Sequence, residues 1–309
     1  MNNTKRSIAS SCGLVLAAAV WGFAFVIVKD SLDYIGAVWM VAFRFTIAAV
    51  LLCFLFLRQL SQLTRRMVVH GAVLGVLIFF AYFFQTIGCK YTTAGKNAFL
   101  TTTYVVLVPL LCWPIYKKRP TWYVFVAAVL CMAGIGLLSL GGAPVIRGGA
   151  YGATYTVSMN KGDVLTLVCG LFYGVHIICI SHFTKTENPV LLTAVQFCCT
   201  AVCGWIAAPL CDGPIPLEAL VTRRVAFSLL YLGVFSTLLA YLLQNIGLAY
   251  VPSALGSLFM SLESVFGVFF SALFLNERLT PRMWIGCAFI FVAILLAEVV
   301  PQLKKTHRP

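Results

Sequence analysis

The stretch "IGAVWMVAFRFTIAAVLLCFLFL" (residues 35–57) places one arginine, Arg44, in the middle of an otherwise uncharged apolar run. A helix needs about 20 consecutive apolar residues to cross the hydrocarbon core of a bilayer, and this run is long enough. An arginine at the centre of such a helix costs about 2.5–3.5 kcal/mol on insertion scales, so it must face protein or water. The stretch therefore predicts a membrane span that packs against a polar interior.

The composition of the whole chain fits the same environment. Of its 309 residues, 61% are hydrophobic and only 10% are charged, whereas roughly a quarter of the residues of a soluble domain are charged. The net charge of +13 comes from short basic clusters between apolar runs, such as Lys5-Arg6 and Arg65-Arg66. Clusters in such places orient membrane helices, so we expect the lipid bilayer, and no nucleic acid, as a partner.

The apolar residues fall into ten segments, most of them joined by short connections. The segments cover residues 11–29, 35–57, 68–89, 93–116, 121–141, 163–183, 189–210, 224–246, 252–275 and 281–300. Each is long enough for a helix that crosses or nearly crosses a bilayer. The sequence therefore predicts an all-α integral membrane protein with ten transmembrane helices.

The longest connection, 142–162, divides the chain into two similar halves, 11–141 and 163–300, which are followed by a basic tail at 301–309. "QTIGCKY" (85–91) closes the third segment and "QNIGLAY" (244–250) closes the eighth. Because five is an odd number, two five-helix copies must enter the membrane in opposite orientations. Inverted repeats of this kind build many secondary transporters, with a site near the midplane between the copies.

The positive charges favour one orientation. An N-terminus in the cytoplasm places twelve lysines and arginines on the cytoplasmic side and nine on the other. The excess of positive charge marks the cytoplasmic side, so we expect both termini in the cytoplasm and the protein in the cell (cytoplasmic) membrane.

The twelve cysteines lie mostly inside apolar segments and lack metal-ligand spacing, so they are interpreted as small core residues. We therefore expect no metal and no cofactor.

Three stretches carry a family resemblance: "LESVFGVFFSALFLNERLTPRMWIGCAFIFVAILLA" (262–297), "VWGFAFVIVK" (20–29) and "FRF" (43–45). They resemble the EamA-type branch of the drug/metabolite transporter (DMT) superfamily, over almost the whole chain. The resemblance implies ten helices around a central cavity lined by spans one to four and six to nine. It also implies transport of small organic solutes, often amino acids or other metabolites and frequently outward. One departure is Ser264, where the family usually has proline after the glutamate of the ninth span.

Arg44 and Glu263 are the charged candidates for the site. Arg44 is either a structural pin that bonds backbone carbonyls of neighbouring helices, or a cavity cation that holds a carboxylate of the solute or of Glu263. Burial disfavours the charged form of a carboxyl group, and Glu263 is the only acidic residue near the middle of a span. It is either a proton-coupling group or a salt-bridge partner of Arg44.

The other candidates for the cavity lining are polar and aromatic residues inside apolar segments. Tyr104 occupies the position that matches Glu263, and His176, in the sixth span, is more often a satisfied core residue than a ligand or proton relay. The remaining candidates are Trp21, Asn97, Tyr173, Gln196 and Gln244.

The favoured function is a secondary active transporter that moves a small organic solute by alternating access, with proton coupling as a further hypothesis. A single copy of the chain suffices for this function. The alternative is a membrane-embedded enzyme that acts on a lipid-soluble substrate. An enzyme needs paired carboxylates or a nucleophile with its base, and no such catalytic spacing is present. We therefore expect no enzymatic activity.

Overall fold

A computed structural model describes residues 3–116, 122–139, 144–146, 154–156, 160–184, 186–250, 253–277 and 280–306. Most of the described residues form helices, and the strands among them are one pair of three residues each. The fold is therefore all-helical in character, as the sequence predicts.

The described residues of the first half form seven helices and the strand pair. They are α1 (Asn3–Ser31), α2 (Ala37–Leu55), α3 (Leu57–Leu60), α4 (Arg65–Tyr91), α5 (Ala94–Thr101), α6 (Tyr104–Tyr116) and α7 (Trp122–Ser139), followed by β1 (Pro144–Ile146) and β2 (Thr154–Thr156). The two strands pair antiparallel, with Val145 opposite Tyr155. They belong to the predicted connection 142–162, most of which lies outside the described residues.

The second half is helical throughout its described residues. Its elements are α8 (Lys161–Phe183), α9 (Pro189–Asp212), α10 (Leu217–Val221), α11 (Arg223–Leu230), the π-helix η1 (Tyr231–Leu239), α12 (Ala240–Tyr250), α13 (Ser253–Leu275) and α14 (Pro281–Thr306). Helix α14 runs through most of the predicted tail 301–309, and residues 307–309 lie outside the described ones.

The fourth apolar segment is broken, although the sequence predicts it as continuous over 93–116. Helix α5 ends at Thr101 and α6 begins at Tyr104. The hydroxyl of Thr102 donates to the carbonyl of Phe99 (2.9 Å), and that of Thr103 donates to the carbonyl of Leu100 (2.7 Å). Threonine hydroxyls that bond the preceding turn compete with the helical ladder, which explains a break at consecutive threonines.

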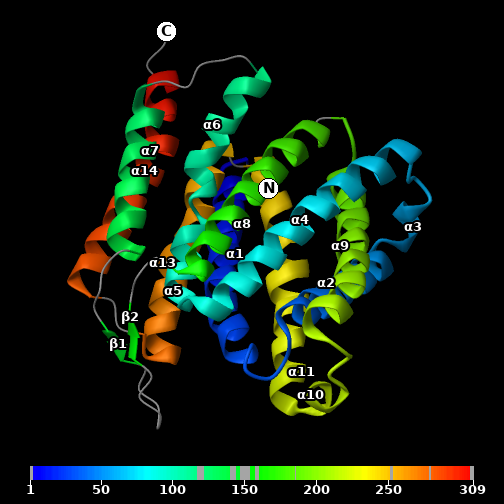
Figure 1. The fold of residues 1–309 in the computed structure, drawn as a ribbon. Helices are drawn as coiled ribbons and strands as arrows, with labels where there is room; N and C mark the ends of the chain where they lie inside the picture. Colours follow the sequence, from blue (N-terminus) through cyan, green and yellow to red (C-terminus); the bar gives the residue numbers. More distant parts are fainter. Residues whose placement is uncertain are drawn as a thin grey trace.

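The helices pack across the two halves rather than within each half alone. Helix α2 lies on α9, α7 on α14, α1 on α13 and α4 on α8, and Figure 1 shows α7 and α14 side by side. The approach of α9 to α2 is close at Gly204, where an added Cβ would lie 2.8 Å from the Cα of Ala42. Helix α13 also approaches α5 closely, because a Cβ added to Gly267 would lie 2.4 Å from the Cβ of Ala98. Small residues therefore set the distance between the halves, as in membrane helix pairs generally.

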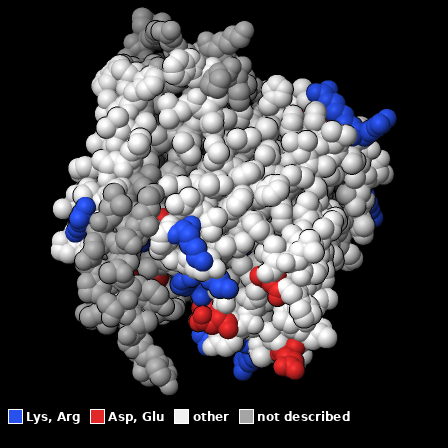
Figure 2. All heavy atoms as spheres, in the orientation of Figure 1, with Lys and Arg blue, Asp and Glu red and all other residues white. Residues whose placement is uncertain are grey.

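The outer surface suits a membrane. Large apolar side chains such as Phe54, Leu210 and Leu273 are more than half exposed. In Figure 2 the charged side chains of the visible face lie mainly in its lower half and at one upper corner, and uncharged atoms cover much of the rest. An apolar belt of this extent on a water-soluble protein would cause association.

Six helical stretches are long and apolar enough to cross a bilayer. They are Ile8–Ser31, Ala37–Leu55, Arg65–Tyr91, Lys161–Ile180, Pro189–Asp212 and Arg223–Gln244. Shorter apolar helices cover Phe125–Gly134, Phe259–Leu275 and Trp284–Ala293. Together with the exposed apolar surface, these helices make the chain an integral membrane protein.

Candidate functional site

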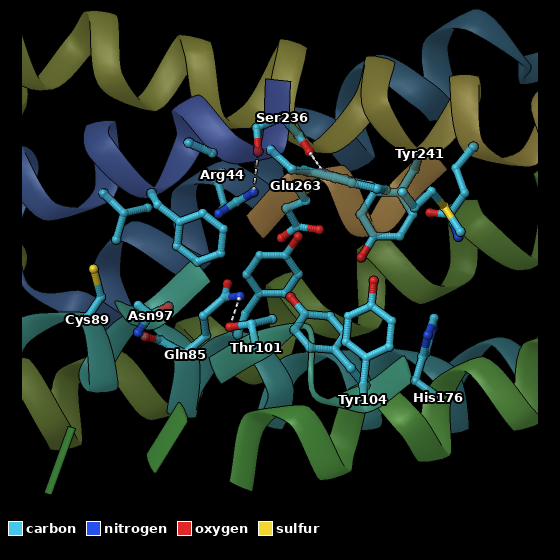
Figure 3. A pocket seen from close by; sticks show the side chains of 18 of the residues that line it. Arg44, Gln85, Cys89, Asn97, Thr101, Tyr104, His176, Ser236, Tyr241 and Glu263 are labelled. Atoms are coloured by element: carbon cyan, nitrogen blue, oxygen red, sulfur yellow. Dashed lines mark hydrogen bonds between the residues drawn. The ribbon is translucent and has the colours of Figure 1, made fainter. Parts of the chain in front are cut away.

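A cavity of about 80 Å³ lies between the two halves. It is lined from the first half by α1, α2, α4, α5 and α6, and from the second half by α8, η1, α12 and α13. Figure 3 shows side chains from these elements pointing toward a common space. A water molecule needs only about 10–15 Å³ of such volume, so the cavity has room for several water molecules or for part of a small solute.

Eight of the nine residues that the sequence singles out line this cavity. They are Trp21, Arg44, Asn97, Tyr104, Tyr173, His176, Gln244 and Glu263. The ninth, Gln196, is not among the lining residues but lies directly behind one of them, because its Oε1 is 3.1 Å from Nε2 of His176. His176 is therefore both a lining residue and a hydrogen-bonded core residue.

Arg44 is 2% exposed and is held by side chains of the π-helix. Its Nε donates to the hydroxyl of Thr237 (3.0 Å), and its Nη2 donates to the hydroxyl of Ser236 (3.1 Å). Its guanidinium carbon also lies 4.4 Å from the ring centre of Tyr82, which is within cation–π range. The sequence predicts carbonyl partners for a structural arginine, and the structure gives it hydroxyl partners from the other half.

Side-chain hydrogen bonds satisfy backbone carbonyls of the π-helix that contacts Arg44. The indole Nε1 of Trp21 donates to the carbonyl of Ser236 (2.8 Å), and the hydroxyl of Thr237 donates to the carbonyl of Leu232 (2.8 Å). π-Helical turns leave backbone groups without their usual helical partners and occur frequently at functional sites. Trp21 and Arg44 thus both attach the first half to this turn of the second half.

Glu263 lies on α13 and is 8% exposed. No Lys, Arg or His nitrogen among the described residues lies within the 4.0 Å of an ion pair with its carboxylate, so Arg44 and Glu263 are not paired with each other. Figure 3 shows the carboxylate directed into the cavity. Arg44 and Glu263 are therefore the charged side chains among the described lining residues, and they do not form an ion pair with each other.

Aromatic side chains form much of the remaining wall. The ring centres of Tyr82 and Tyr173 are 5.6 Å apart, and those of Tyr104 and Tyr173 are 6.1 Å apart. The ring of Trp21, from the first half, meets that of Tyr241, from the second half, edge to face, with the ring centres 5.7 Å apart. Such walls combine an apolar surface with a few hydrogen-bonding groups, which is the usual character of a site for a small organic molecule.

The helix break between α5 and α6 adds further polar groups to the cavity. Nε2 of Gln85 donates to the hydroxyl of Thr101 (3.2 Å). Nδ2 of Asn97 donates to the carbonyl of Gln85 (3.1 Å) and to the hydroxyl of Thr166 (3.0 Å), which leaves its Oδ1 buried without a partner. Broken helices supply the binding sites of several transporter folds.

Sequence reasoning missed several residues of this region. Tyr82, Gln85, Thr101, Ser236, Tyr241 and Met260 also line the cavity. Gln85 carried a usable signal, because it is a strongly polar residue inside an apolar segment, as Arg44 is. Ser236 and Met260 carried none, since their type is ordinary in a membrane helix.

Within the described ranges no group of three or more His, Cys, Asp or Glu side chains is arranged to hold a metal ion.

Comparison with known proteins gives a consistent result. The profile of the EamA-like transporter family matches residues 9–140 and again 160–298. An uncharacterized transporter of Archaeoglobus fulgidus is 33% identical over 298 residues, which cover 95% of this chain and 87% of that protein. Protein PecM of Dickeya dadantii is 27% identical over 244 residues, covering 76% of this chain and 75% of that one.

A solved crystal structure shares the fold. It superimposes with a TM-score of 0.65 at 16% identity and covers 96% of this chain and 99% of that one.

The family profile and the names of the relatives point to transporters and not to enzymes, so they do not support the alternative of a membrane-embedded enzyme. The chain belongs to the EamA-like transporter family and is an integral membrane transport protein.

Proposed function

We propose that this protein is a secondary active transporter that moves a small organic solute, an amino acid or another metabolite, through the cavity between its halves by alternating access. The observation that carries the proposal is the placement of Arg44 and Glu263 in one cavity, unpaired, between helices of both halves. Charged groups inside a membrane protein mark solute and ion pathways. A channel would instead favour rings of side chains from several subunits.

We propose further that the halves are inverted repeats of five spans, 11–141 and 163–300. The broken helix α5–α6 counts as one span, and α11, η1 and α12 count as another. Packing supports this arrangement, because the corresponding helices α2 and α9 contact each other, as do α7 and α14. Helix α1 packs on α12 and α13, just as α8 packs on α4, α5 and α6. The twofold match of the family profile supports the same division.

Arg44 is suited to hold an anionic group of the solute. Ser236 and Thr237 occupy its Nε and one N–H of Nη2, and guanidinium has five N–H donors. The remaining donors are available to a carboxylate without loss of the bonds that position the side chain. This role and the structural role are therefore compatible.

Glu263 is suited to couple transport to a proton gradient. It is buried, it lies beside a cavity with room for water, and among the described residues no cation within 4.0 Å holds it in its charged form. A carboxyl group in such a place exchanges its proton with cavity water when the cavity opens. One copy of the chain contains all these groups, so a monomer suffices.

The proposed orientation places both termini in the cytoplasm, with the protein in the cytoplasmic membrane. The bias of twelve against nine basic residues supports it. In this orientation α1 and α4 end, and α5 and α8 begin, on the extracytoplasmic side.

A thermal-shift screen of the purified protein against metabolites tests the proposal. A solute present at about 100 times its dissociation constant stabilises the folded protein by about 2.7 kcal/mol, which raises the Tm. The matched control is Arg44→Gln, in which hits that carry a carboxylate should lose most of their effect while neutral additives behave as before. If no metabolite raises the Tm and none shows saturable uptake in proteoliposomes, the proposal is wrong.

A further inference from the structure

A polar cluster joins the two halves beside one end of the cavity. The cluster consists of Lys29, Thr92, Lys96, Asp163 and Glu277. It lies where α1 and α4 end and where α5 and α8 begin. Two cavity residues adjoin it: Asn97 follows Lys96 in the chain, and the carbonyl of Cys89 accepts a hydrogen bond from Nζ of Lys29 (2.7 Å).

The centre of the cluster is a buried ion pair. Nζ of Lys96, on α5, lies 2.8 Å from Oδ2 of Asp163, on α8, and the two side chains are 3% and 0% exposed. The hydroxyl of Thr92 donates to Oδ1 of the same carboxylate (2.7 Å), and the backbone N–H of Asn160 donates to Oδ2 (3.2 Å). Asp163 also completes the capping box that starts α8. The pair therefore links residues 67 positions apart and holds the start of one half against the fourth span of the other.

Two further charges tie neighbouring helix ends to this pair. The carboxylate of Glu277 accepts from the backbone N–H groups of Ala94 (2.9 Å) and Gly95 (3.1 Å), so it caps the start of α5. Nζ of Lys29 donates to the carbonyls of Cys89 and Thr92 (2.6 Å), which lie at the end of α4. A negative charge at a helix start and a positive charge at a helix end each suit the helix dipole.

The energetics of this arrangement suggest a switch rather than simple reinforcement. A buried ion pair gains little over apolar packing, because both charges lose their hydration. Losing one partner of such a pair, however, is strongly unfavourable unless water enters. The two charges are therefore stable when they are in contact and shielded from water, or when they are separated and both hydrated. Intermediate arrangements, with the charges separated but still buried, are unfavourable.

A second polar link between the halves lies where α4 begins and α8 ends. There, Oε1 of Glu187 lies 3.1 Å from Nε of Arg66 and 2.7 Å from Nδ1 of His70. The side chain of Arg66 is 67% exposed, whereas that of Glu187 is only 4% exposed, so this link is partly buried. The halves are thus linked by polar side chains near both ends of α4 and α8.

We propose that the Lys96–Asp163 cluster is a gate that seals the cavity at the end where α1 and α4 finish and that must dissociate each time the cavity opens there. This proposal rests on the proposed function, and in the proposed orientation the gate is extracytoplasmic. Lys29 and Glu277 hold the helix ends that separate when the ion pair breaks. Thr92 sets the position of the carboxylate in the closed state.

Cys89 reports on this gate without any knowledge of the solute. Its side chain is fully buried, lines the cavity and adjoins the cluster. Sealed right-side-out vesicles are treated with a membrane-impermeant maleimide, and mass spectrometry measures labelling of each cysteine. Lys96→Met should speed the labelling of Cys89 by roughly tenfold or more, because it breaks a buried pair. Thr92→Val, which removes one hydrogen bond and should fold normally, should speed it by roughly threefold to tenfold.

Lys90→Met is the matched control, because Lys90 lies at the same end of α4 but is exposed. In this variant Cys89 should be labelled at the wild-type rate. Labelling of Cys89 in both test variants within twofold of the wild-type rate would overturn the gate. An equal increase in the labelling rates of the buried Cys131 and Cys287 would also overturn the gate, because that pattern indicates a loss of packing throughout the protein. Stabilisation of the wild type by a metabolite does not depend on this result, so failure of the gate leaves the transport proposal standing.

Discussion

At the scale of single residues, the most informative feature is the separation of Arg44 from Glu263. Arg44 donates hydrogen bonds to Ser236 and Thr237 and lies over the ring of Tyr82. Glu263 has no described Lys, Arg or His nitrogen within ion-pair distance. A direct salt bridge would have fixed both groups in one structural role. Their separation leaves one group suited to bind an anion and the other suited to exchange a proton.

Replacing Glu263 by glutamine tests the second role. Glutamine has nearly the same shape but no titratable proton, so solute flux driven by a pH gradient in proteoliposomes should fall to the level seen without the gradient. Exchange of solute for solute, which needs no net proton movement, should continue. Glu218→Gln, at an exposed position on α10, is the matched control and should leave both fluxes unchanged. Gradient-driven flux that survives in Glu263→Gln would remove the proton role.

At the scale of helices, two irregular segments distinguish the cavity from ordinary packing. The break between α5 and α6 exposes the groups around Thr101, and η1 presents Ser236 and Thr237 to Arg44. Both segments depend on close contacts with the opposite half. One close contact between the halves beside the break is that of Gly267 on α13 with Ala98 on α5.

Gly267→Ala tests whether this contact is needed. The added methyl group would lie 2.4 Å from the Cβ of Ala98, so the helices must separate. Overpacking of this kind typically costs about 1–3 kcal/mol, and the Tm of the purified variant should fall. Gly13→Ala is the control, since its added methyl would meet only Leu243 at an ordinary 3.5 Å. Equal Tm values for the two variants would contradict the role of this contact.

The sequence predicts the helical class and part of the cavity lining because both depend on local features. Apolar runs of sufficient length indicate membrane helices, and polar residues inside them, such as Arg44 and Asn97, must turn toward the interior. The break at Thr102 and Thr103 and the π-helix η1 were not predicted, because each depends on hydrogen bonds that only the folded helices supply. The Lys96–Asp163 pair was missed for the same reason, since it joins segments that no local pattern relates.

At the scale of the whole molecule, contacts between the halves dominate the structure. Several cavity groups are positioned by the other half, as Arg44 is by η1 and Asn97 by Thr166 of α8. A relative movement of the halves would therefore change the cavity and both of its ends together. Alternating access requires this kind of coupling between a central site and two ends.

Counterflow in proteoliposomes, with the metabolite found by thermal shift, tests the central claim that this cavity carries the solute. Vesicles loaded with unlabelled solute should take up labelled solute transiently and saturably. Met260→Trp, which fills the cavity from α13, should abolish this uptake. Phe269→Trp, at an exposed position of the same helix, should preserve it. Flux that rises linearly without saturation, or counterflow that persists in folded Met260→Trp protein, would contradict the account.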